Sequence, residues 1–521
     1  MRIAFATRAG IAAVWLLFMA WVFRYEARPD LFTRTVDGYR GLLGRDVPVM
    51  DSWMIVRFQG EPIGYSHTLL EVNDANPLEY HLFRNSVHLR FSALGTEQTV
   101  NTEVEASLNM LYELQKFEFR LSSPGYSLSV RGRRVDERRF QTHWRTDHTR
   151  RTASIEIPPD AVIYSPMTAM ALKRLRPGQT LSLKTLDPTT LGTATATLRA
   201  LRTETLELAG VSHEALVVAT EYLGMRTLSW IALTDGGTLR QETPFGWTME
   251  AATVDEAFAA LRAAGSATTD MLTRLAVPVR GHIADPRGSR ALRLRLVGVP
   301  FEPAALASHR QHVERVEGNE TVLRVEAERL PTPSLRQAGL PAPSEAADDI
   351  RRPDAELEAD AIAPFLAPSQ GVESDHPDMM AQARKITEGH ADPLARARAI
   401  FDWVHRNLEK EMTVSMPSAL DVLRTRKGDC NEHTYLFVAL ARAAGLPARI
   451  LVGLAYHEGA FYYHAWPSVH VGRWLEMDPT WGQEAVDATH IAVVEGDLSQ
   501  QVEIVRMVGR LTIEILEEER L

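Results

Sequence analysis

The only cysteine of this 521-residue chain lies in the stretch KGDCNEHTYLFVALARAAG, which runs from Lys427 to Gly445. Asp429 and Glu432 stand three residues apart, as in a capping box, and an apolar stripe follows them, so the pattern predicts a helix that begins at Cys430. Free amides and the positive end of a helix dipole favour a thiolate there, and a nearby imidazolium would lower the pKa of the thiol further. Cys430 is therefore a candidate nucleophile, and the competing interpretation is a small buried apolar side chain.

A candidate base and its partner follow in FYYHAWPSVHVGRWLEMDPTWG, which predicts two strands around a turn at Gly472. His464 would be the base, and Asp478 would orient its ring. A two-residue loop would put these two side chains on opposite faces of the hairpin. A three-residue loop, with His470 opposite Trp474, would make them neighbours on one face, and a bulge in the first strand would have the same effect. The catalytic hypothesis therefore depends on the register of this hairpin.

The segments that precede the cysteine have the periodicity of helices. Asp392 is a plausible N-cap with Pro393 at the first helical position, and apolar residues recur behind it at three- and four-residue steps. Ser418 can cap a second, shorter helix that ends near Leu423. Together with the strands around His464, these helices predict an α+β domain over residues 374–521.

The N-terminal half has a different pattern. Alternating apolar and polar stretches separated by turn residues run over residues 51–265, with a hairpin around Gln59 to Pro62, and predict a large antiparallel sheet, either curved or an open barrel. Residues 266–330 contain a smaller β-like region. Residues 331–373 are rich in Pro, Ala and acidic residues and predict a linker or a loosely packed wrap.

The first residues resemble an export signal. An apolar run from Ala9 to Phe23 follows two arginines, and no clear cleavage site follows the run. Residues 1–25 are therefore interpreted as an uncleaved signal anchor that crosses the membrane, and residues 26–50 as a juxtamembrane segment. The bulk of the chain would then be extracytoplasmic, and periplasmic in a bacterium. A cleaved signal peptide and a buried N-terminal helix are the alternatives.

Composition narrows the classes of partner. With 45% hydrophobic and 24% charged residues the chain is globular, and a formal charge of −10 disfavours nucleic acid as a partner. A peptide or protein substrate fits better. Cys430, His433 and either His457 or His464 could be imagined as metal ligands, but no metal-binding spacing supports them, and neither a metal nor a cofactor is expected.

Four short motifs occur in order along the C-terminal part: GDC, AGLPARILVG, HAW and DPTWG. Together they resemble the transglutaminase-like superfamily of thiol enzymes, which is related to papain in its core fold. The resemblance covers roughly residues 394–482, and a later stretch, DATHIAVVEGD, is more weakly similar to bacterial members. It implies that Cys430 is the nucleophile, His464 the general base and acid, and Asp478 the group that holds the imidazole. The sequence departs from many relatives after HAW, where Pro467 and Ser468 stand.

Two functions from different classes remain. The first is a membrane-anchored thiol enzyme that cleaves or transfers the acyl groups of peptide or side-chain amides, with hydrolysis favoured because short connections leave little chain to wall off water. The second is a catalytically silent scaffold of the cell envelope that binds a partner through its β-rich part. Three residues are candidates for oxyanion or substrate contacts, namely Asn431 through its backbone amide, Trp403 and Trp466.

Overall fold

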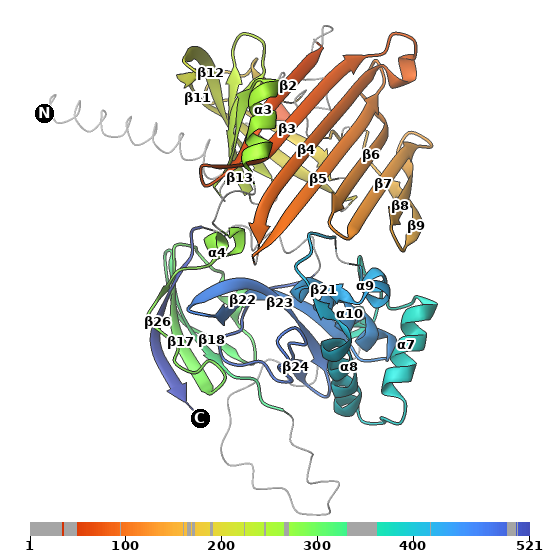
Figure 1. Cartoon of the computed structure of the whole chain (residues 1–521), viewed down its shortest axis with the longest axis vertical. Helices are drawn as coiled ribbons and strands as arrows, with labels where there is room; N and C mark the ends of the chain where they lie inside the picture. Colours follow the sequence, from red (N-terminus) through yellow and green to blue (C-terminus); the bar gives the residue numbers. More distant parts are fainter. Residues whose placement is uncertain are drawn as a thin grey trace, which may run out of the picture.

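The computed structural model describes residues 34–35 and 49–520, with gaps at 94, 160, 164–167, 169–171, 188–190, 223–224, 244–245, 265–269, 331–361, 417, 497–506 and 508. The N-terminal half forms one 15-stranded sheet, which lies above the helical part of the molecule in Figure 1. Its strands are β1 (Arg34–Thr35), β2 (Met50–Phe58), β3 (Glu61–Val72), β4 (His81–Ala93), β5 (Thr96–Leu108), β6 (Leu114–Ser123), β7 (Tyr126–Arg134), β8 (Arg139–Thr146), β9 (Arg150–Glu156), β10 (Thr180–Leu186), β11 (Thr193–Leu208), β12 (Val211–Tyr222), β13 (Met225–Ala232), β14 (Thr238–Glu242) and β15 (Trp247–Ala252).

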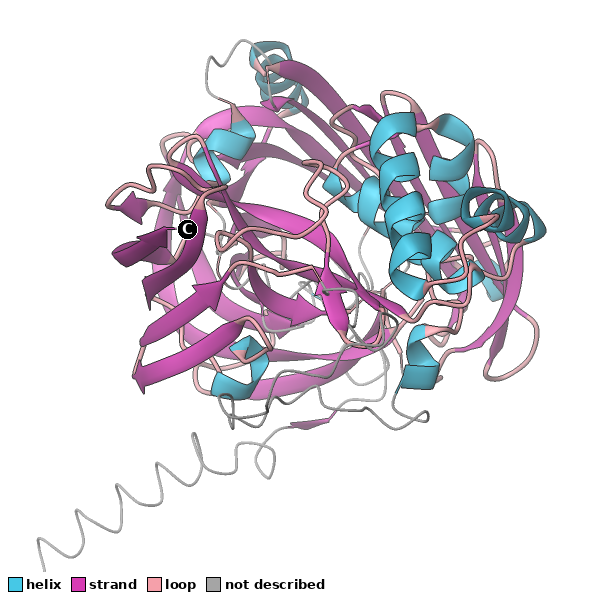
Figure 2. Cartoon of the chain, turned by 90° about the horizontal axis from the view of Figure 1, so that it is seen from below, coloured by secondary structure: helices cyan, strands magenta, loops and turns pink. Residues whose placement is uncertain are grey.

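The large sheet is curved, as the alternating pattern predicts. Strands β2 to β9 follow one another across one half of the sheet, and β10 to β15 across the other, with β15 paired to β2 where the halves join. Side chains from both halves, such as Phe117 and Leu198, share one apolar core, so the sheet curls around its buried face (Figure 2). The predicted hairpin is present: Gln59 and Gly60 have φ of 49° and 90°, the left-handed values of a tight two-residue turn.

A second sheet of five strands brings distant parts of the chain together. Its order is β16-β26-β17-β19-β18, with β16 (Val279–Arg280), β17 (Ser289–Val297), β18 (Gln311–Glu317), β19 (Glu320–Glu326) and β26 (Thr512–Arg520). Short helices lie around both sheets: η4 (Pro77–Glu79), α3 (Val254–Ala263), α4 (Met271–Leu275), α5 (Pro303–Leu306) and η6 (Ala363–Phe365). Since β26 pairs with β17, the last residues of the chain complete the region that the sequence assigns to 266–330.

The C-terminal part is the α+β domain that the sequence predicts. Helices α7 (Pro377–Thr387), α8 (Pro393–Asn407), α9 (Ala419–Thr425) and α10 (Cys430–Ala443) lie beside a four-stranded sheet in the order β24-β23-β22-β25. The strands are β22 (Ala448–His457), β23 (Ala460–His470), β24 (Trp474–Glu476) and β25 (Ile491–Glu495), and a small pair joins β20 (Glu409–Lys410) to β21 (Lys427–Gly428). Both predicted N-caps are confirmed, since Asp392 and Ser418 each accept a backbone N–H of their helix.

Two sequence-based interpretations fall on parts that the structure leaves out. The signal anchor at residues 1–25 lies outside the described residues, as does most of the linker at 331–373. Within the part of the chain that is described, no helix has both the length and the apolar character needed to cross a membrane.

A glycine allows the strands of the four-stranded sheet to pack closely. Gly453 of β22 lies opposite His464 of β23, and on its other side β25 approaches so closely that a Cβ atom at this position would come within 1.9 Å of the Ile491 carbonyl oxygen. No ordinary side chain fits there without moving β25.

We therefore expect Gly453→Ala to lower the free energy of unfolding by about 1–3 kcal/mol, the usual cost of overpacking, because β25 must shift. Denaturant unfolding of both proteins measures the difference. Equal unfolding free energies would contradict the close approach of β25.

Candidate active site

The thiol is held at the start of α10 by the predicted capping box. The Asp429 carboxylate accepts the backbone N–H of Asn431 at 2.9 Å, and the Glu432 carboxylate accepts the backbone N–H of Asp429 at 2.9 Å. Cys430 is the first residue of the helix, as predicted, and its side chain is half-buried. The helix itself is buried against β23 and β22, which fixes the direction of the thiol.

The hairpin of β23 and β24 adopts the three-residue alternative. His470 lies opposite Trp474 and Ser468 opposite Glu476, so the loop consists of residues 471–473. In this register Asp478, which follows β24, lies on the same face of the hairpin as His464, as the catalytic hypothesis requires. His464 Nε2 lies 2.9 Å from Asp478 Oδ2, and both side chains are buried.

Asp478 is a buried carboxylate with several partners. Its Oδ1 accepts the backbone N–H groups of Thr480 at 2.8 Å and Trp481 at 3.1 Å, and its Oδ2 faces the rings of His464 and His490. Burial alone would raise the pKa of this carboxyl group, but the charges and hydrogen bonds of the two histidines hold it well below its usual range. Asp478 is therefore an anion on which an imidazole can be oriented.

The thiol and the histidine meet at β23. The backbone N–H of Ala465, the residue after His464, donates to the Cys430 sulfur. Trp481 stacks on the His464 ring, with centroids 4.4 Å apart and an angle of 20° between the planes. The tryptophan therefore covers one face of the imidazole and shields its bond to Asp478 from water.

The expected lowering of the thiol pKa is wrong. Burial, followed by the charge of Asp429, raises the pKa of the Cys430 thiol well above its ordinary value, and the hydrogen bond from the Ala465 amide opposes this only in part. The cap that starts the helix thus also places a carboxylate beside the sulfur. The raised pKa favours the thiol form of Cys430 over the thiolate.

The three residues considered for oxyanion or substrate contacts lie in different surroundings. The Asn431 amide already donates to the Asp429 side chain. Trp403 lies on α8 at the edge of the apolar core, with the Arg426 guanidinium 4.2 Å from its ring centroid. Trp466 is completely buried, and its Nε1 donates to Glu476 at 2.9 Å. Trp466 therefore supports the site from behind, since a contact with substrate needs an exposed surface.

The residues considered as metal ligands, Cys430, His433 and either His457 or His464, do not form a cluster of ligand atoms in the part of the chain that the structure describes. His433 is buried, its Nδ1 lies 2.7 Å from the Asp429 carbonyl oxygen, and burial lowers its pKa. His457 is exposed near the end of β22. A different group, His464, Asp478 and His490, has ligand atoms within 4.8 Å of one another.

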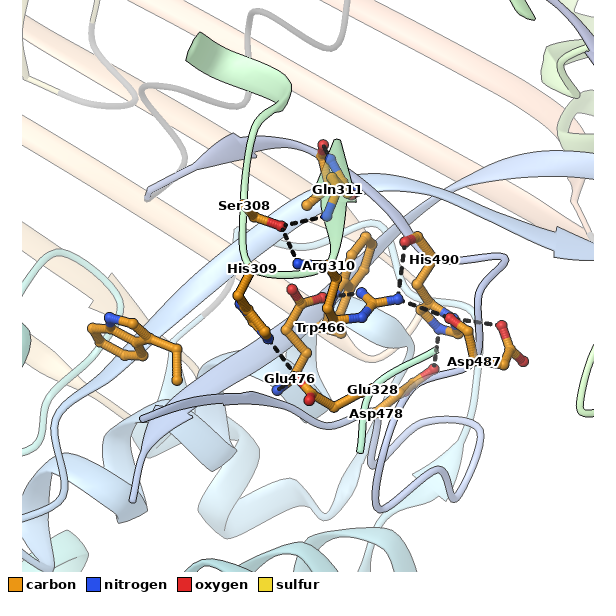
Figure 3. A network of polar contacts seen from close by, with 12 residues as sticks. Ser308, His309, Arg310, Gln311, Glu328, Trp466, Glu476, Asp478, Asp487 and His490 are labelled. Atoms are coloured by element: carbon orange, nitrogen blue, oxygen red, sulfur yellow. Dashed lines mark hydrogen bonds and ion pairs between the residues drawn. The ribbon is translucent and has the colours of Figure 1, made fainter. Parts of the chain in front are cut away.

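Sequence reasoning missed His490 and Arg310. His490 lies just before β25, in the DATHIAVVEGD stretch, whose weak similarity to bacterial transglutaminase-like proteins was the signal that could have found it. Arg310 lies just before β18, 168 residues away from Asp478 in the chain, and donates to Glu476 at 2.6 Å inside the protein (Figure 3). No local pattern could have connected a residue beside the five-stranded sheet to the domain that carries Asp478.

A loop before α9 connects the capping box to the large sheet. Ser415 donates to the Glu432 carboxylate at 2.5 Å, and the Thr413 amide donates to Asp429. From the large sheet, the Ser123 hydroxyl donates to the Val414 carbonyl at 2.7 Å, and the Tyr126 hydroxyl donates to the Met416 carbonyl at 3.1 Å. The hairpin of β6 and β7 thus holds the loop that holds the start of α10.

Comparison with known proteins identifies the family of the segment that carries these residues. Residues 380–479 match the model of the transglutaminase-like superfamily, so this segment is a transglutaminase-like domain. It contains the cysteine, the histidine and the aspartate described above.

Curated relatives match only a segment of the chain. The kyphoscoliosis peptidase of Mus musculus is 32% identical over 119 residues, which are 20% of this chain and 18% of that protein. An uncharacterized protein of Haemophilus influenzae is 33% identical over 107 residues, or 18% of this chain and 27% of its own length. The periplasmic domain of TgpA from Pseudomonas aeruginosa, solved with ethylmercury, is 18% identical, covers 38% of this chain and 92% of its own, and has a TM-score of 0.23.

The raised thiol pKa gives a test that uses the single cysteine. In Asp429→Asn the helix keeps a good N-cap but loses the carboxylate charge beside the sulfur, so the pKa of the Cys430 thiol falls. Alkylation by iodoacetamide, followed by intact mass at a series of pH values, should reach half its maximal rate at a lower pH than in the wild type.

The wild-type midpoint should lie above the ordinary thiol value of about 8.5. Cys430→Ala is the control and takes up no label, because the chain has no other cysteine. A variant midpoint equal to or above that of the wild type would contradict the role assigned to Asp429.

Proposed function

We propose that this protein is a thiol enzyme that hydrolyses peptide or side-chain amides through Cys430, His464 and Asp478. The observation that carries the proposal is the buried 2.9 Å contact between His464 Nε2 and Asp478 Oδ2, next to a cysteine at a helix start. With Nε2 on the aspartate, Nδ1 is the ring nitrogen that serves the thiol. This fixes the imidazole in the tautomer that a general base needs.

The reaction runs in two halves. His464 takes the proton of the Cys430 thiol as the sulfur attacks the amide carbonyl, and a tetrahedral intermediate forms. The C–N bond then breaks as the imidazolium gives its proton to the departing amine, which leaves a thioester on Cys430. His464 next removes a proton from water, which attacks the thioester, and the acid product leaves as the thiol is restored. The raised pKa of the thiol makes the base essential to the first step.

Hydrolysis is favoured over transfer by the short connections around the site. The β22–β23 turn contains only Glu458 and Gly459, and α10 and β22 are joined by four residues, 444–447. Little chain is therefore available within this domain to wall off water, which is the most abundant acceptor for a thioester.

We further propose that the chain is anchored to a membrane by residues 1–25, with the catalytic domain outside the cytoplasm and a peptide or protein as substrate. The apolar run at the N-terminus supports the anchor. The net charge of −10 supports a partner other than nucleic acid.

Replacing each member of the triad tests the reaction. Cys430→Ala should abolish amide hydrolysis, because no other thiol is available. His464→Ala and Asp478→Asn should each lower kcat by about 10²- to 10⁴-fold, the usual contribution of a positioned acid–base group. Ammonia release and amine incorporation from glutamine-containing peptides, followed by mass spectrometry, measure both outcomes.

Incorporation that exceeds hydrolysis at millimolar amine would make the protein a transferase. If neither product forms from any peptide or amide in a library, while Cys430→Ala still binds an envelope partner as the wild type does, the silent scaffold is the correct function.

The membrane proposal has its own test. A reporter enzyme that is active only outside the cytoplasm, fused after Gly44, should be active, because the anchor would carry this position across the membrane. The same reporter fused to a chain that begins at residue 26 is the control and should be inactive. Activity of a cytoplasmic reporter alone at Gly44 would refute the anchor.

A further inference from the structure

We propose that His490 is a positioning residue of the active site, an imidazolium that holds Asp478 at the same carboxylate oxygen as His464 does. The inference rests on the proposed function and adds a residue to its site. His490 is completely buried, and its Nε2 lies 3.3 Å from Asp478 Oδ2, the oxygen that His464 also contacts. Its Nδ1 lies 3.1 Å from Asp487 Oδ1, so the ring bridges two carboxylates.

Each ring nitrogen of His490 must carry a proton to donate a hydrogen bond to the carboxylate that it contacts. An anionic carboxylate only accepts hydrogen bonds, so an imidazole placed between two of them fits best with both nitrogens protonated. Burial acts to lower the pKa of His490, but the hydrogen bonds and charges of Asp478 and Asp487 raise it. The same contacts hold the pKa of Asp487 at about 2. A metal ligand needs an unprotonated nitrogen, so this arrangement fits a cation better than a metal site.

Asp487 is itself fixed in place. Its Oδ1 accepts the Thr489 hydroxyl at 2.6 Å and the Thr489 amide at 2.9 Å, and its Oδ2 accepts the Gln483 side chain at 2.9 Å. Gln483 in turn pairs through its backbone with Asp478, at 2.8 Å in both directions. The two carboxylates are thus tied to each other by the chain, and the spacing between them fits one imidazole ring.

Further charges surround this bridge and come from several elements. Arg310 donates to the carbonyl oxygens of Asp487 at 2.9 Å and His490 at 3.4 Å, and to the Glu476 carboxylate (Figure 3). The titratable or charged groups that face His490 or its partners are Asp478, Asp487, His464, Glu476, Arg310 and Arg287. The rings of Trp466 and Trp481 close the remaining sides, with centroids 5.1 and 5.5 Å from that of His490.

A cation on Asp478 changes what the carboxylate does for His464. A lone Asp478 anion would strongly stabilise a proton added to His464, and so a thiolate–imidazolium pair in the free enzyme. With His490 on the same oxygen, part of that negative charge is already compensated. This partial compensation weakens the attraction between Asp478 and a positively charged partner. The carboxylate keeps its orientation because two rings and two amides hold it.

The test uses His490→Gln in the full chain, since glutamine retains an N–H donor but carries no charge. We expect faster alkylation of Cys430 by iodoacetamide at pH 7, because Asp478 then stabilises the ion pair more strongly. The gain should vanish in the double variant with His464→Ala. In contrast, kcat for amide hydrolysis should fall by about tenfold to a hundredfold with little change in KM, as when a partner that orients a histidine is lost.

His309→Gln is the matched control. His309 lies 2.7 Å from the Glu328 carboxylate in the same polar network and belongs to no part of the proposed site, so both readouts should remain at wild-type values.

A third measurement needs no substrate. In ¹⁵N NMR of histidine-labelled protein, both ring nitrogens of His490 should be protonated at pH 7, and in Asp487→Asn the ring should lose a proton at a lower pH. Asp487→Asn therefore tests the charge of His490 even if His490→Gln does not fold. A His490 ring that is neutral at pH 7, or folded His490→Gln with unchanged alkylation, would overturn the inference. Absence of turnover by the wild type would instead refute the proposed function and leave the NMR result to stand for His490.

Discussion

The buried carboxylate of Asp478 is the constraint on which the arrangement of the site depends. An ion in the protein interior must be compensated, and this one is compensated by two backbone amides and two imidazole rings. These four partners come from three places, namely the turn after Asp478, β23 and the segment before β25. The need to satisfy one charge therefore fixes the relative positions of the strands that carry the histidines.

A second buried charge, on Glu476, is compensated by a residue beside the five-stranded sheet. Arg310 and Glu476 are both buried and form an ion pair at 2.6 Å, and Trp466 donates to the same Glu476 oxygen. Removing one partner of such a pair leaves an uncompensated charge, which is far more costly than the pair itself is favourable. This ion pair thus joins the segment before β18 to the transglutaminase-like domain, and the five-stranded sheet and that domain share one apolar core.

The helix start that carries Cys430 is held from the other side by part-buried contacts. The hairpin of β6 and β7 donates to two carbonyl groups of the loop that supports Asp429 and Glu432. A movement of the large sheet relative to the helices would first displace the loop at residues 413–416, and then the cap of α10. The histidine and aspartate are fixed by buried ions, whereas the thiol depends on a loop between two parts of the protein.

The local elements of this protein could be predicted from its amino-acid sequence. The N-caps at Asp392, Ser418 and Asp429, the first helical position of Cys430 and the tight turn at Gln59 and Gly60 follow from interactions within a few residues, which the sequence displays directly. The hairpin register, the direction of the shift in the thiol pKa, and the places of His490 beside Asp478 and of Arg310 beside Asp487 became clear only from the folded chain. These depend on burial and on charges from distant segments. Desolvation and Coulomb energies act through space between groups that have no fixed spacing along the chain.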